Sequence, residues 1–190
     1  MGFLDSILGG RKKLQNANAD RLFAMATAQV TLETSLNMRA RGQAAIVFQQ
    51  INNADFKQIL TDSEELIKSA AADTGTTISQ QADDYGYQWM VFSDPDFDDL
   101  VTAVNTVASE LQAGGYGDRV LAAVFAWDDG GQAVDFIYNF KRGKFYPFVP
   151  KPGKTRDTEY ELRVKAQLEH DLPFEPELER WFPLWDAPLS

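Results

Sequence analysis

Apolar and polar positions follow their most regular pattern between residues 94 and 115, where apolar side chains recur every three or four residues. This spacing places them on one face of a helix. Asp94 is the expected N-cap, Pro95 suits the first helical position because no hydrogen bond is needed from its nitrogen, and Gly114 and Gly115 end the helix. We therefore predict a core helix whose buried face carries Phe97, Leu100, Val101, Val104, Val107, Ala108 and Leu111.

Alternating apolar residues, separated by turn-forming residues, predict a series of strands. Two hairpins are the clearest, one turning at residues 83–86 and the other at residues 129–131. The strand over 120–127 is apolar on both faces, so we expect it to lie in the centre of a sheet that is covered on both sides. Strands are predicted over residues 28–33, 44–50, 76–82, 87–93, 120–127, 132–140 and 144–149.

The remaining helical signals are a turn over residues 22–25, a helix that begins at Asp62 or Ser63, and another that begins at about Thr158. Together these elements predict an α+β fold: a single domain with an antiparallel β-sheet of about five to seven strands and helices packed mainly on one face. The order of elements is similar to that of secretion-chaperone-like domains, which is an analogy of fold alone. The predicted parts are an N-terminal amphipathic segment and polar linker (1–20), the α+β domain (21–172), and a Pro/aromatic C-terminal tail packed on the domain (173–190).

Composition narrows the class of protein. With 190 residues, 44% of them hydrophobic and 12% aromatic, the chain can bury a core of its own. It has no cysteine, which excludes disulfides, thiolate metal sites and a cysteine nucleophile and fits a cytoplasmic location. Its formal net charge of −10 opposes nucleic-acid binding, because such binding relies on basic side chains that neutralise phosphates.

Sequence motifs select no catalytic, cofactor-binding or metal-binding residue. His170 is the sole histidine, and no Gly-x-Ser-x-Gly elbow is present to supply a serine nucleophile. The acidic run from residue 94 fails as a calcium loop, because Asp99 and Asn105 stand where glycine and glutamate are required. We therefore predict a protein that is not an enzyme and needs no cofactor. The alternative is a hydrolase that uses an acid–base carboxylate pair which the sequence does not identify.

Three segments are candidate binding sites. A basic stretch with interleaved aromatics could bind an acidic partner, although basic residues also protect edge strands. The aromatic C-terminal tail suits a partner-binding site, although such tails more often cover the core of their own domain. An apolar N-terminal turn, followed by basic residues, could touch a membrane surface or a partner. The candidate partner-binding residues are Lys141, Arg142, Lys144, Tyr146, Trp181, Phe182 and Trp185, and the candidate membrane or partner contacts are Phe3, Leu4, Ile7 and Leu8.

Several segments together resemble one protein family, the PspAB family of PspA-associated proteins. They are residues 1–9, 85–89, 94–101, the stretch YNFKRGKFYPF over 138–148, and the closing segments 172–176 and 180–185. The resemblance follows nearly the whole chain in order, and no segment in it is a catalytic signature. It implies a non-enzymatic interaction partner or adaptor in an envelope-stress response built around phage-shock protein A.

The resemblance also implies candidate partners, namely a PspA-type protein or an HtpX-type membrane protease system. A homodimer is a further candidate assembly. We expect a cytoplasmic protein whose membrane contact is at most peripheral, at the inner face, because the acidic body opposes binding to an anionic membrane.

Overall fold

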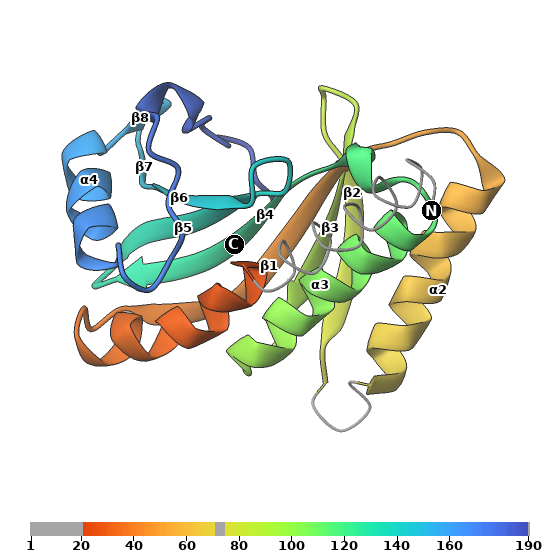
Figure 1. Ribbon diagram of the computed structural model, residues 1–190, viewed down its shortest axis with the longest axis horizontal. Coiled ribbons are helices and arrows are strands. Elements are labelled where there is room, and N and C mark those ends of the chain that lie inside the picture. Colours follow the sequence, from red (N-terminus) through yellow and green to blue (C-terminus); the bar gives the residue numbers. More distant parts are fainter. Residues whose placement is uncertain (1–20, 71–74, 190) are drawn as a thin grey trace, which may run out of the picture.

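The computed structural model describes residues 21–70 and 75–189. Its main strands are β1 (Arg39–Gln49), β2 (Thr77–Ala82), β3 (Tyr87–Ser93), β4 (Val120–Asp129), β5 (Gln132–Asn139) and β6 (Lys144–Phe148). They form one six-stranded sheet in the order β2-β3-β1-β4-β5-β6, and every neighbouring pair is antiparallel (Figure 1). A short ribbon of β7 (Pro150–Lys151) and β8 (Thr155–Arg156) follows β6.

Within the described residues, four α-helices accompany this sheet: one over residues 21–34, α2 (Ala54–Ala70), α3 (Phe97–Ala113) and α4 (Thr158–Gln167). The chain also makes two 3₁₀ turns, η1 (Gly117–Arg119) and η2 (Leu178–Arg180). Helix α3 packs against α2 and β1, while α4 contacts β6 and lies at the opposite end of the sheet (Figure 1). The α+β prediction is confirmed.

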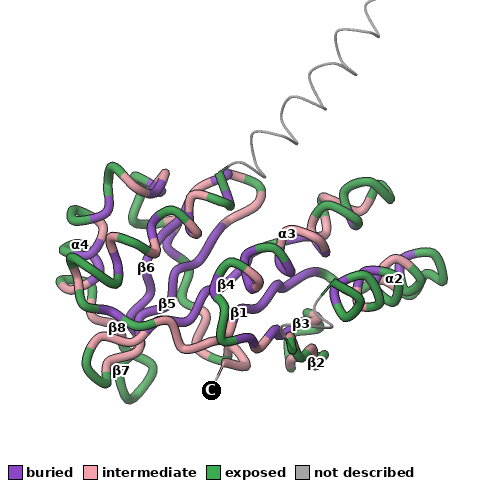
Figure 2. Tube along the Cα trace, turned by 90° about the horizontal axis from the view of Figure 1, so that it is seen from below, coloured by how far each residue is buried: buried purple, intermediate pink, exposed green. Residues whose placement is uncertain are grey.

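The sheet separates two apolar clusters. Successive residues of a strand point to opposite faces, and β1 shows this directly. Ala44, Ile46 and Phe48 face the helices, whereas Ala45 and Val47 face the other side. The central strands are therefore continuously buried over only part of their length, from Ala44 to Phe48 in β1 and from Ala123 to Trp127 in β4, as the tube coloured by burial shows (Figure 2). The second cluster is covered by the C-terminal tail, from which Trp181, Leu184, Trp185, Ala187 and Leu189 pack on the sheet.

The prediction of a strand over residues 28–33 is wrong, since these residues lie in the helix over 21–34. Leu22, Met25, Ala28 and Leu32 are all buried, and their spacing of three and four residues is that of one helical face. Val30, which contributed to the weak alternation within the segment, lies on the solvent side and is 64% exposed. The helix predicted from Asp62 or Ser63 begins earlier, at Ala54, and buries Phe56 and Leu60 in its first turns.

The start of α3 differs from the prediction in one detail. Its N-cap is Asp96, whose side chain accepts a hydrogen bond from Asp98 N at 2.9 Å. Asp94 is instead buried, and its carboxylate accepts hydrogen bonds from Asp96 N and from the hydroxyl of Thr76. It therefore ties the beginning of α3 to the segment before β2. The predicted apolar face of α3 is confirmed from Phe97 to Leu111.

Candidate functional site

The C-terminal tail is built into the edge of the sheet. Phe145 N in β6 donates to Pro173 O at 2.9 Å, and Glu175 N donates to Phe145 O at 2.8 Å. Phe145 and Phe174 form a parallel bridge, so the tail briefly extends the sheet before it crosses to the face opposite the helices. This path brings most of the sequence-predicted binding residues together, because the basic stretch forms β6 and its turns.

Aromatic side chains fix the tail on this face. The ring of Trp181 stacks on Tyr146 with centroids 6.2 Å apart, and its indole N–H donates to Glu175 O at 3.0 Å. Trp185 meets Phe148 edge-on at 5.0 Å. Tyr146 and Trp181 are buried, and burial raises the pKa of the Tyr146 hydroxyl. These two residues therefore hold the tail to the sheet and are not accessible to a partner.

Phe182 is exposed, whereas its neighbour Trp181 is buried. The hydroxyl of Tyr146 donates to Phe182 O at 3.0 Å, which fixes the backbone at this point. The side chain of Phe182 nevertheless remains 58% exposed, and Leu178 in η2 is 43% exposed. The tail thus presents apolar side chains to solvent from a backbone that is anchored on both sides of Trp181.

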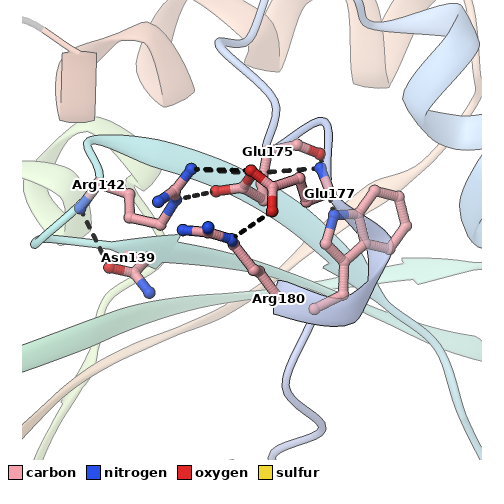
Figure 3. A network of polar contacts seen from close by, with 6 residues as sticks. Asn139, Arg142, Glu175, Glu177 and Arg180 are labelled. Atoms are coloured by element: carbon pink, nitrogen blue, oxygen red, sulfur yellow. Dashed lines mark hydrogen bonds and ion pairs between the residues drawn. The ribbon is translucent and has the colours of Figure 1, made fainter.

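A charge network joins the β5–β6 turn to the tail (Figure 3). The Arg142 guanidinium contacts the carboxylate of Glu175, which is 1% exposed, and its Nη2 lies 3.7 Å from Glu177 Oε1. Arg180 Nε donates to Glu177 Oε2 at 2.8 Å, and Arg142 N donates to Asn139 Oδ1 at 3.2 Å. Because Glu175 is buried, loss of its cationic partner would leave an uncompensated charge.

A second buried pair connects α4, β6 and the tail. Arg156 Nε donates to both carboxylate oxygens of Glu161, at 3.0 and 2.9 Å, and Arg156 Nη1 donates to Trp181 O at 2.6 Å. Glu161 is fully buried and also accepts from Val149 N at 2.8 Å. Burial raises the pKa of Glu161, while the hydrogen bonds from Arg156 and Val149 act in the opposite direction. The guanidinium of Arg156 lies 5.1 Å from the centre of the Phe148 ring.

The charge of the basic stretch is largely matched within the protein. Lys151 Nζ lies 2.6 Å from Asp157, and Lys154 Nζ lies 3.3 Å from Asp186. Lys141 is exposed and Lys144 is half-buried, and neither forms an ion pair with another described residue. Fewer basic side chains are therefore available to contact a partner than the sequence suggested.

Sequence reasoning missed the two buried glutamates of this region. Glu161 could have been found, because it lies three and seven residues before Val164 and Leu168 and so shares their apolar stripe. A charged residue in such a stripe indicates a buried ion pair. Glu175 carries no comparable signal, since its partner Arg142 lies 33 residues away in the chain.

His170 has a side chain that is 94% exposed and lies 3.7 Å from Glu169. In the parts of the chain that the structure describes, no group of three or more metal-ligating side chains comes together. None of the helices over these residues is long and apolar enough to cross a membrane. Phe3, Leu4, Ile7 and Leu8 lie outside the described residues, and their contact with a membrane or a partner stays a prediction.

The fold and the site together define an α+β protein whose antiparallel sheet is covered by helices on one face and by its own C-terminal tail on the other. The family model PspAB, PspA associated protein B, matches residues 1–189, and the chain belongs to this family. The resemblance noted in the sequence is thus confirmed. Neither the curated proteins nor the solved structures contain a match to this chain, and the secretion-chaperone-like analogy stays a prediction.

Proposed function

We propose that this chain is a non-enzymatic adaptor of a PspA-linked envelope-stress response and that it binds its protein partner through the tail surface, defined here as Leu178 and Phe182. The family description, PspA associated protein B, supports the choice of a PspA-type protein as partner. The observation that carries the proposal is the exposed ring of Phe182 on an anchored backbone. An HtpX-type membrane protease system is the second candidate partner.

The geometry of the tail surface suits a binding hot spot. An aromatic ring held by a fixed backbone loses little conformational freedom when a partner covers it. The backbone of Phe182 is held by Tyr146, and Trp181 beside it is packed in the core. A partner can therefore bury this ring without having to order the tail.

Charge indicates the chemistry of the partner. Lys144 lies two residues before Tyr146 in β6, which places both side chains on the same face, and Lys141 lies in the preceding turn. Lys141 and Lys144 are thus close in the chain to Tyr146, which anchors the tail surface. The protein as a whole carries a net charge of −10. We expect a partner with an apolar pocket bordered by acidic side chains.

The experiment uses the full chain and a purified PspA-type protein from the same host, with binding measured by calorimetry. Phe182→Ala should weaken the Kd at least about thirtyfold, since a hot-spot residue contributes about 2 kcal/mol or more. Leu66→Ala is the matched control, because Leu66 is 52% exposed on α2 and lies outside the tail surface. Its Kd should equal that of the wild type.

Two results would overturn the proposal. Equal affinities of Phe182→Ala and wild type would exclude the tail surface as the binding site. An absence of binding between the wild-type chain and the PspA-type protein would exclude that partner, and the same titration with the HtpX-type protease would then test the second candidate. Circular dichroism of each variant checks that the fold is retained.

A further inference from the structure

The two edge strands of the sheet, β6 and β2, differ in how their outer backbone groups are covered. The β6 edge is closed by the tail, through the hydrogen bonds of Phe145 with Pro173 and Glu175, and Pro147 removes one donor from this strand. At the other end, β2 is the outermost strand and pairs only with β3 among the described strands (Figure 1). Its sequence, TISQQA, contains no charge and no proline, and its register with β3 is continuous. Among the residues that the structure describes, β2 therefore lacks the usual protection of an edge strand.

The hydrogen bonds at both ends of the hairpin show which backbone groups of β2 face outwards. Asp83 N donates to Tyr87 O at 2.9 Å, so the odd-numbered residues of β2 bond to β3. Asp94 N donates to Gly42 O at 3.0 Å, which shows independently that the even-numbered residues of β3 bond to β1. The N–H and C=O groups of Ile78, Gln80 and Ala82 consequently point away from the sheet. They form a row of donors and acceptors that fits one more strand.

A cavity of about 210 Å³ lies beside this edge and includes Gln80 of β2 together with Gln88 of β3. Its remaining lining comes from α2 and the segment before it: Gln50, Phe56, Lys57, Leu60 and Thr61. A strand added to β2 would place alternate side chains on the helix side of the sheet, next to this cavity. The outer edge of β2 thus offers main-chain hydrogen bonds to an added strand, and the cavity beside it offers space for one of that strand's side chains.

The charge around β2 is acidic. Asp83 and Asp84 form the turn at the end of the strand, whereas Glu64 of α2, which accepts a hydrogen bond from the side-chain amide of Gln80, is paired with Lys68 at 3.1 Å. From Lys68 to Arg119 the sequence contains acids and no further basic residue. Each copy of this chain carries a net charge of −10, and this charge opposes the pairing of two copies. A strand with basic side chains meets complementary charge instead.

We propose that the outer edge of β2 is a docking site for an extended segment of a partner protein that carries basic side chains, which adds to the sheet as a further strand. This site is separate from the tail surface, and the test below does not depend on the identity of the partner of that surface. The backbone of Ile78, Gln80 and Ala82 supplies the affinity, and the acidic surroundings select the charge of the segment.

The test uses three synthetic probes and the ¹⁵N-labelled full chain. The first probe is an extended peptide of alternating valine and lysine, the second has glutamate in place of lysine, and the third is the lysine peptide with alternate backbone nitrogens methylated. The lysine peptide should shift the amide resonances of Ile78, Gln80 and Ala82 and slow their hydrogen exchange. The glutamate and methylated peptides should bind at least about tenfold more weakly, since they lose charge complementarity and main-chain hydrogen bonds respectively.

Two variants distinguish the contribution of the Gln80 backbone N–H to binding from that of the Gln80 side chain. Gln80→Pro removes an outward N–H that the sheet does not use, so the fold should persist while the affinity for the lysine peptide falls about tenfold. Gln80→Ala is the matched control, because it keeps the N–H and should keep most of the affinity. Equal binding of the lysine and methylated peptides would overturn the proposal, and this comparison holds even where Gln80→Pro fails to fold. A dimeric mass of the free protein, with these three amides already protected, would show that a second copy occupies the edge and would equally overturn it.

Discussion

Replacing Asp135 with asparagine should stabilise the protein by an amount that grows as the pH rises from 4 to 8. Asp135 lies in β5 between Ala126 of β4 and Phe148 of β6, and its side chain is only 7% exposed. Its Oδ1 accepts no hydrogen bond from any described residue. Burial raises the pKa of this carboxyl to about 6, although the positive charge of Arg41 acts against that rise.

The sign of the effect follows from the two pKa values. The unfolded chain ionises Asp135 near its ordinary pKa of 3.8, while the folded chain holds the proton up to about pH 6. Ionisation therefore favours the unfolded state, and stability falls as the pH rises through this window. One unit of pKa corresponds to about 1.36 kcal/mol, so the full cost above pH 6 is about 3 kcal/mol. About 2 kcal/mol of this develops between pH 4 and pH 8.

Urea denaturation of wild type and Asp135→Asn at several pH values between 4 and 8 measures this cost. The difference between the two proteins is the informative quantity, because other acids titrate in both. Asp157, for example, has a pKa lowered by its hydrogen bond with Lys151, and that contribution to stability is lost as the pH falls. Asp84→Asn, at an exposed turn position, is the matched control for the removal of one negative charge. A constant difference for Asp135→Asn would refute the reasoning.

Three further predictions test the packing. Val104→Asp places an unpaired charge in the fully buried face of α3 and should abolish the cooperative thermal transition, whereas Thr102→Asp, exposed on the same helix, should melt like the wild type. Glu161→Gln removes the anion beside Arg156 and should cost about 3 kcal/mol in urea denaturation, and a cost near zero would show that the pair is dispensable. Trp181→Ala should cost about 3 kcal/mol and speed proteolytic cleavage within the tail, and an unchanged cleavage rate would mean that other contacts hold it.

The elements that could be predicted from sequence are those whose signals are local. The helix α3 has a cap, an apolar stripe and a glycine stop between Asp96 and Gly114, and the two hairpins are marked by turn residues between alternating strands. The family resemblance was carried by the same kind of evidence, short segments in a fixed order. The helix over residues 21–34 was misassigned because its buried positions are partly alanine and methionine, which differ little from their neighbours in a short window.

The binding surfaces depended on contacts between distant parts of the chain. The sequence placed Tyr146, Trp181 and Phe182 in the same list of candidates, and only the fold shows that the first two anchor the tail while Phe182 faces solvent. Likewise, TISQQA is an ordinary strand sequence until the order of the sheet makes it an open edge. Periodicity and turn chemistry act over a few residues, whereas burial and edge position arise from strand order, which is set by the whole core at once.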